Sequence, residues 1–182
     1  MRVIGIDLSL TSTGMCMVTE SGVDAWTVES KPNGDSLAAR AARLVVMMER
    51  INPLPRYGWP DMAVIEAPAH SRGADPGHHA RAGLWWGTVI KLRECRIPVV
   101  EVTPGGRAKY ATGKGNAGKD AVLAAVIRRY DGVCLVGCND EADALILAAM
   151  GARHLGHPIE PGPLPAANLA AMDSVRWPAV TA

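Results

Sequence analysis

Three short runs in the first thirty residues constrain the fold more than any other feature of the chain. Residues 2–7 (RVIGID), 15–20 (MCMVTE) and 23–30 (VDAWTVES) are largely apolar or alternating, and turn-forming residues separate them. Runs of this length, bounded by turns, predict an antiparallel meander of three strands. We expect Gly14 to permit the backbone bend between the first two strands.

The rest of the chain alternates between strand and helix patterns. Apolar runs predict further strands at residues 62–67 and 97–103. Helical patterns cover residues 80–95, 119–130 and 140–155, and residues 104–118 predict a loop or a short helix. The order predicts an α/β fold: a mixed five-stranded sheet, begun by the three meander strands, with helices on both faces.

Two of the predicted helices have a recognisable apolar face. Between residues 37 and 51 the spacing of three and four residues is typical of a helix that packs on a core. The inward residues are Leu37, Ala41, Leu44, Met48 and Ile51 in this first helix, and Ala121, Val122, Ala125 and Val126 in residues 119–130.

The length of 182 residues suits one domain with a sizeable core. We expect this domain to cover residues 1–156 and to be followed by an irregular, proline-rich, peripheral tail over residues 157–182. No apolar run reaches about 18 residues, so we expect no membrane span. The four cysteines form no CxxC pair, which favours reduced thiols in a cytoplasmic protein.

Charge is unevenly distributed although the net charge is only +1. Between Ala67 and Lys119 there are nine lysine and arginine residues and only three acidic ones. A basic segment of this kind predicts one face for an anionic partner, while an unevenly charged solvated surface is the simpler alternative.

Four carboxylates stand at positions where this fold would bring them together. Asp7 and Glu66 end two predicted strands, and Asp140 and Asp143 begin the last long helix, three residues apart. Like charges at close range repel unless a cation neutralises them, and Mg²⁺ prefers carboxylate oxygens together with water and phosphate. Two metals about 4 Å apart can activate water for phosphodiester cleavage. Taken singly, each acid could equally be a strand-end or helix-start residue.

Four motifs together resemble the RuvC family of Holliday-junction resolvases, within the ribonuclease H-like superfamily. The motifs are GIDLSLTSTG (5–14), VIEAPA (64–69), TGKGNAGKDAV (112–122) and DEADALILAA (140–149), and the resemblance spans roughly residues 2–155. Each motif is weak alone, but four in this order are fairly specific.

The resemblance implies a ribonuclease H-like fold and an endonuclease that nicks four-way DNA junctions symmetrically as a homodimer. It implies two Mg²⁺ ions per active site, which Mn²⁺ could replace, held by Asp7, Glu66, Asp140 and Asp143. Lysines that match the family's glycine-rich loop would lie near the cleaved strand, with Lys119 also acting in catalysis. The expected DNA-binding residues are Lys114, Lys119, Arg72, His70, Arg107 and Lys109.

The sequence departs from the family pattern at two places. Leu8 and Ser9 stand where the family has proline and glycine after the first acid. The loop after Glu66 has no aromatic residue other than histidine, so His70 and Arg72 are the nearest side chains that could stack on a base. We therefore expect altered junction or sequence preference, as in a diverged or phage-type member.

Weaker signals favour simpler readings. GKGNAGKD (113–120) lacks the final hydroxyl residue of a nucleotide-binding loop. His70, His78 and His79 lack partners at zinc-site spacing. Trp85 and Trp86 predict one core contact and one subunit contact, although a wholly internal packing is also open. Two other functions stay open: a non-catalytic binder of branched DNA on the same fold, and an actin-like ATPase or kinase.

Overall fold

The computed structural model describes residues 1–51, 57–68 and 77–179. Five strands form one sheet in the order β3-β2-β1-β4-β5. The first three strands are antiparallel neighbours, and β4 and β5 run parallel to β1. The predicted meander and mixed five-stranded sheet are confirmed. The strands are β1 (Arg2–Asp7), β2 (Ser12–Thr19), β3 (Gly22–Glu29), β4 (Met62–Glu66) and β5 (Val99–Val102).

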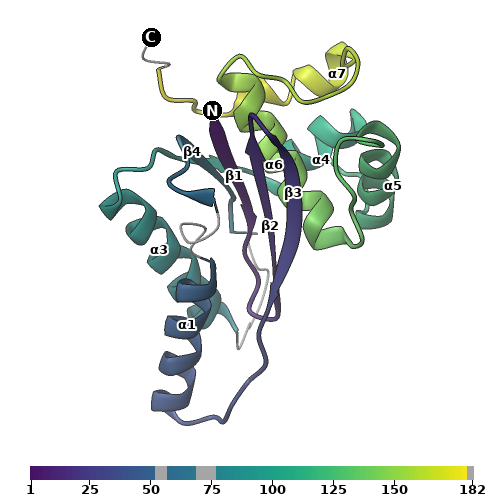
Figure 1. The fold of residues 1–182 in the computed structure, drawn as a ribbon. Helices are drawn as coiled ribbons and strands as arrows, with labels where there is room; N and C mark the ends of the chain where they lie inside the picture. Colours follow the sequence, from purple (N-terminus) through teal and green to yellow (C-terminus); the bar gives the residue numbers. More distant parts are fainter. Residues whose placement is uncertain (52–56, 69–76, 180–182) are drawn as a thin grey trace.

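Helices cover both faces of the sheet, as predicted (Figure 1). One face carries α1 and α3, and the other carries α4, α5 and α6. Two short elements follow α6. The helices are α1 (Leu37–Ile51), α3 (His78–Glu94), α4 (Pro104–Thr112), α5 (Lys119–Arg129), α6 (Asn139–His154), α7 (Ala166–Leu169) and the 3₁₀ turn η1 (Met172–Ser174).

Alternation along β1 divides the core into two layers. Ile4 and Ile6 pack with the cluster under α1 and α3, whereas Val3 packs with the cluster under α4, α5 and α6. Helix α6 is buried from Ala142 to Ala152, so it is the central helix of its layer. A helix that is apolar on all sides is typical of this position.

Two glycines allow α6 to lie directly on the sheet. A Cβ atom at Gly5 would come closer than 3.0 Å to the backbone of Ala144, and one at Gly14 would come equally close to the backbone of Asp140. The prediction that Gly14 permits a bend is wrong, because Gly14 lies within the antiparallel pairing of β2, opposite Asp7. Its role is to allow close approach of the first turn of α6.

Two predicted helix faces are wrong in part. Leu37 is 76% exposed and Ala41 is also exposed, because α1 extends beyond the sheet at its N-terminal end (Figure 1). The residues that reach the core are Met47 and Ile51, near the other end of the helix. In α5, Ala121 is exposed while Val122, Ala125 and Val126 are buried, as expected. Periodicity gives the face of a helix but not how far the sheet extends beneath it.

The segment 104–118 begins with a helix. The hydroxyl of Thr103 accepts a hydrogen bond from the backbone of Gly106 at 3.0 Å, and Pro104 is the first helical residue. Gly113 ends the helix with a φ of 82°. A side-chain cap, a proline at the start and a left-handed glycine at the end are the ordinary boundaries of a short helix.

Residues 157–179 are neither irregular throughout nor peripheral, which corrects the prediction of an irregular, peripheral tail for this part of the chain. This segment contains α7 and η1, and Leu164, Asn168 and Ala171 are buried. The Glu160 side chain is fully buried, where it accepts hydrogen bonds from Tyr110 and Tyr130 and pairs with Arg153. These contacts fasten the segment to α4, α5 and α6. The domain boundary at residue 156 stays a prediction.

Among the residues that the structure describes, no helix combines the length and the apolar character that crossing a membrane requires.

Candidate active site and its carboxylates

Asp7 and Glu66 end neighbouring parallel strands. The register pairs Ile6 of β1 with Ile65 of β4, so the next residue of each strand is an acid. Both side chains therefore lie at the same edge of the sheet. The Glu66 end of β4 is held from the other side as well, because the indole N–H of Trp85 donates to the Glu66 carbonyl at 2.9 Å.

Helix α6 brings the other two acids to this edge. Its first turn lies against Gly14, the β2 residue that pairs with Asp7. Asp140 is partly exposed, whereas Asp143, one turn further on, is only 2% exposed. The structure thus places all four predicted carboxylates at one site, from β1, β4 and α6.

Arg107 of α4 lies between the acids. Its Nε donates to Glu66, and one terminal nitrogen donates to Asp143, so one guanidinium joins β4 to α6. Arg107 is only 7% exposed. Its donors are engaged by carboxylates below the surface, and the predicted contact of Arg107 with DNA stays a prediction.

Burial and mutual repulsion dominate the electrostatics of the site. Burial, followed by the charges of Glu66 and Asp143, raises the pKa of Asp7 to about 8. Burial also raises the pKa of Asp143 to about 6, although neighbouring Arg107 opposes this shift. Asp140 contributes to both increases. The four acids therefore lie within electrostatic range of one another. The single positive charge of Arg107 does not neutralise their negative charges fully.

The chemistry of the donor set fits a hard divalent cation. All four candidate ligands offer carboxylate oxygen, which Mg²⁺ and Mn²⁺ accept. Within residues 1–51, 57–68 and 77–179, no three acid, histidine or cysteine side chains form a ready-made metal site. Arg107 occupies oxygens of two of the four acids, so the cluster matches a metal in composition but is arranged around a guanidinium.

A cleft of about 360 Å³ opens beside Asp7 and Glu66. Its opposite wall is the first two turns of α3, which contribute His78, Arg81 and Trp85. Leu8 and Ser9, the residues that depart from the family pattern, also line this cleft. The two residues that differ from the family pattern therefore border the space next to Asp7 and Glu66.

The predicted lysines differ in their exposure. Lys119, the first residue of α5, is exposed and its charge lowers the pKa of Asp143. Lys114 is exposed in the link between α4 and α5, and Lys109 is half-buried on α4. The predictions for His70 and Arg72 fall outside the described residues.

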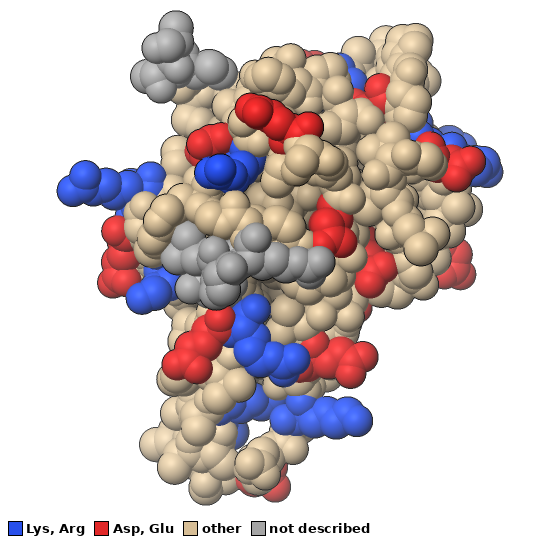
Figure 2. Space-filling model, in the orientation of Figure 1, with Lys and Arg blue, Asp and Glu red and all other residues tan. Residues whose placement is uncertain are grey.

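The positive charges of the basic segment are spread along the sheet. Helix α3 starts at the carboxylate edge and runs back along the sheet, so Lys91 and Arg93 lie near its far end, where β5 begins. Two basic residues after β5, Arg107 and Lys119, lie at the carboxylate edge. Figure 2 shows red and blue side chains intermixed over the face in view. That the basic segment provides one face for an anionic partner stays a prediction.

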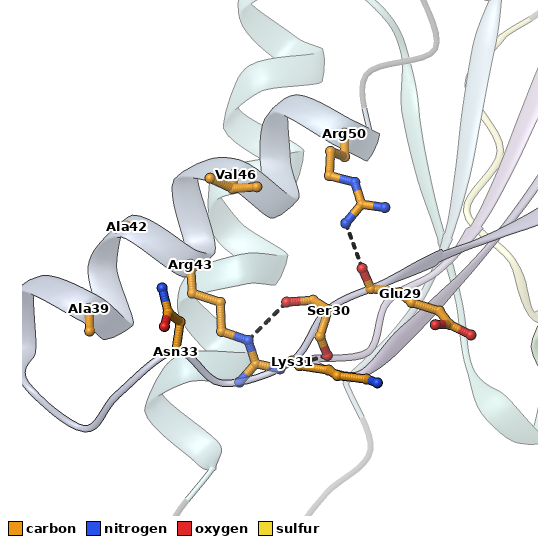
Figure 3. Close-up of a pocket in the computed structure, with 9 residues that line it drawn as sticks. All are labelled: Glu29, Ser30, Lys31, Asn33, Ala39, Ala42, Arg43, Val46 and Arg50. Carbon is orange, nitrogen blue, oxygen red and sulfur yellow. Dashed lines mark hydrogen bonds between the residues drawn. The ribbon is translucent and has the colours of Figure 1, made fainter.

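A second hollow lies at the same edge of the sheet, between the end of β3 and α1. Its volume is about 540 Å³. Figure 3 shows Arg50 reaching the Glu29 carbonyl, at 2.7 Å, and Arg43 reaching Ser30. Arg43 also donates to the carbonyl of Leu10 in the link after Asp7. Arg43 therefore fixes the β1–β2 link against the end of β3.

Sequence reasoning missed the position of Arg107 and the anchoring role of Trp85. A signal for Arg107 was present: Thr103 and Pro104 mark a helix start directly after a strand that ends at the carboxylate edge. A residue in the first turn of that helix must lie near this edge. Nothing in the sequence pattern pointed to the hydrogen bond of Trp85.

No family model matches the chain. Curated proteins do: the crossover junction endodeoxyribonuclease RuvC of Paracidovorax citrulli is 32% identical, over 81% of this chain and 82% of its own length. The protein of the same name from Zymomonas mobilis is 30% identical, over 83% of this chain and 90% of its own length. The protein of the same name from Synechococcus sp. is 29% identical, over 83% of this chain and 97% of its own length.

Solved structures agree on the fold. Thermus thermophilus RuvC in complex with a Holliday junction substrate matches with a TM-score of 0.57 and 21% identity, covering 81% of this chain and 90% of that one. The structure of T. thermophilus RuvC matches with a TM-score of 0.58 and 18% identity, covering 88% and 99%. On the sequence identity to curated relatives, the chain belongs to the RuvC family of crossover junction endodeoxyribonucleases.

Proposed function

We propose that this protein is a metal-dependent endonuclease that cleaves four-way or other branched DNA by hydrolysis of phosphodiester bonds. The observation that carries the proposal is the convergence of Asp7, Glu66, Asp140 and Asp143 at one edge of the sheet, beside an open cleft. Carboxylates placed next to a DNA phosphate repel it, so a protein that only binds DNA gains nothing from them.

The four carboxylates are the proposed ligands of two Mg²⁺ ions, with Mn²⁺ as a substitute. Bound there, the cations would supply a nucleophilic water and stabilise charge on the leaving oxygen. The protein contributes the rigid position of the acids. β1 and β4 fix two of them through strand pairing, and Gly5 and Gly14 fix the helix that carries the others.

The proposed DNA contacts lie around this edge. Lys119 is close enough to influence Asp143, and Lys114 is exposed in the adjoining link. Lysines at these places offer point charges to phosphate oxygens, and Lys119 would also stabilise charge at the cleaved phosphate. Lys109 is a weaker candidate because it is half-buried. His70 and Arg72, outside the described residues, stay proposed DNA contacts from the sequence.

We also propose a homodimer, which would place two active sites on one junction. Trp86 and Ile90 of α3 are 59% and 54% exposed, and Val45 and Val46 of the adjacent helix α1 are each 49% exposed. Exposed large apolar side chains on these two packed helices suit an interface between copies of the chain. A cytoplasmic location is proposed as well; the four cysteines are free thiols in the structure.

One observation favours a second function. Because Arg107 already neutralises part of the acid cluster, a metal-free protein could tolerate a nearby phosphate and act as a branched-DNA binder without cleavage. The actin-like alternative gains no such observation.

The test is cleavage of a labelled synthetic four-way junction, beside linear duplex of the same sequence, with Mg²⁺ and with EDTA. Wild type should give metal-dependent nicks on the junction. Asp143→Asn should lose at least about two orders of magnitude in rate, since its charge is central to the site. Asp120→Asn, an exposed acid on α5, is the matched control. A tight junction complex without cleavage in Mg²⁺ or Mn²⁺ would move the function to binding alone.

A further inference from the structure

We propose that Arg107 is an internal counter-cation of the carboxylate cluster, which must release at least one acid before a divalent cation can occupy the site. This inference rests on the proposed function, because it assumes that these carboxylates hold a metal. It concerns a residue that the sequence pattern placed among the DNA contacts.

The contacts of Arg107 support the inference directly. Its guanidinium is buried and donates to Glu66 from Nε and to Asp143 from a terminal nitrogen. Both acids are candidate metal ligands, and they come from different elements, β4 and α6. The N–H groups point at carboxylate oxygens that a cation would need. A lone pair that accepts a guanidinium N–H cannot bind a metal ion at the same time.

The charge balance of the cluster points the same way. Four acids and one buried arginine leave a negative excess when the acids are ionised. A divalent cation would compete with Arg107 for this excess. With both present, the two positive charges would repel each other across a short distance in a site partly removed from water. Arg107 therefore stabilises the metal-free protein and weakens metal binding.

A purely structural role makes a different prediction. If the two ion pairs only hold α4 against β4 and α6, their removal misplaces Glu66 and Asp143. Metal affinity would then fall together with stability. The counter-cation role predicts opposite signs for these two quantities: stability without metal falls, and metal affinity rises.

The experiment measures Mn²⁺ binding to the full chain without DNA, by the electron paramagnetic resonance signal of free Mn²⁺, together with thermal unfolding in EDTA. Arg107→Gln should bind Mn²⁺ at least about tenfold more tightly than wild type, because one repelling charge is gone. Its unfolding temperature in EDTA should be lower. Arg107→Lys keeps the charge and should remain nearer to the wild-type affinity.

Arg129→Gln is the matched control. Arg129 is half-buried against α4, less deeply than Arg107, and it donates to the carbonyls of Tyr110 and Ala111, at the far end of that helix. Its loss should lower stability and leave Mn²⁺ affinity unchanged. This control separates the removal of one positive charge in general from its removal at the carboxylates.

The outcomes are distinct. Equal or weaker Mn²⁺ binding by Arg107→Gln would overturn the inference and leave Arg107 a positioning residue. No Mn²⁺ binding by any variant, wild type included, would overturn the metal site itself and with it the proposed function.

If Arg107→Gln does not fold, the wild type still provides a test. The Nε–H resonance of Arg107 in ¹⁵N-arginine-labelled protein should shift or broaden when Mg²⁺ saturates the site, while that of Arg129 stays in place. An Arg107 resonance that Mg²⁺ at saturation leaves unchanged would refute the inference.

Discussion

Gly14 lies directly against the backbone of Asp140. A Cβ atom there would come closer than 3.0 Å to the carbonyl of Asp140. Because Gly14 also pairs with Asp7 across the sheet, this contact sets how close α6 comes to β1, and so how close the acids come to one another.

Gly14→Ala should therefore push the first turn of α6 away from the sheet. We expect a loss of roughly 1–3 kcal/mol of unfolding free energy, as for an overpacked core, together with a large loss of junction cleavage. Urea unfolding and single-turnover cleavage measure the two effects. Gly162→Ala is the control, since a Cβ at Gly162 meets no atom within 4 Å. Full activity of Gly14→Ala would show that the contact yields easily.

The raised pKa of Asp7 predicts how stability depends on pH without metal. A carboxyl group whose pKa rises from 3.8 to about 8 on folding binds more protons in the folded state between these values. The stability that it contributes is present at low pH and declines as the pH rises through about 8. Ionisation is opposed by burial and by Glu66, Asp143 and Asp140, although Arg107 offsets it in part.

Asp7→Asn should remove this dependence. In EDTA, the difference in urea midpoint between Asp7→Asn and wild type should grow in favour of the variant from about pH 5 up to about pH 8, and then level off. Mg²⁺ at high pH should favour the wild type instead, since it binds the ionised acid. A constant difference across this range would contradict the assigned pKa.

The buried carboxylate of Glu160 should be essential for docking the C-terminal segment. It accepts hydrogen bonds from Tyr130 at 3.0 Å and Arg153 at 2.6 Å, and also from Tyr110. Glu160→Gln should cost roughly 2 kcal/mol or more, because a buried charge pair loses one member. Limited proteolysis should then release residues beyond 156. Glu20→Gln, at an exposed ion pair, should leave the thermal midpoint unchanged.

Trp86 should lie at the interface of the proposed homodimer. Trp86→Glu places a charge among the exposed apolar side chains of α3 and should convert the dimer to a monomer in sedimentation experiments. Leu135→Glu is the control, because Leu135 is 95% exposed in the link between α5 and α6. A monomeric wild type, or a dimer that tolerates Trp86→Glu, would place the interface elsewhere.

Lys119 should contribute more to DNA binding than Lys91, although both are exposed lysines. Lys119 lies at the carboxylate edge, whereas Lys91 lies towards the opposite end of the sheet and pairs with Glu94 at 3.9 Å. Lys119→Gln should reduce the slope of log affinity against log salt for a four-way junction by about 1. Equal slopes for Lys119→Gln and Lys91→Gln would show that Lys119 does not lie in the DNA interface.

Much of the fold followed from local pattern. The three meander strands, the two parallel strands and the helices between them are each marked by periodicity and turn residues that act within a few positions. The positions of Asp7 and Glu66 at the ends of neighbouring strands also followed, because strand order places them at one edge. The order of the four motifs predicted that Asp140 and Asp143 of α6 belong to the same site.

Tertiary packing decided the features that depend on distant residues. From the sequence, Arg107 is one of several expected DNA-binding residues. Only the packing of α4 against β4 and α6 buries it between two acids. Leu37 belongs to a regular apolar stripe, yet it is exposed because the sheet ends before it. Glu160 stands in a proline-rich tail but is buried by three partners at least seven positions away. Side-chain pattern determines local conformation, while burial and charge pairing arise only when separate elements pack together.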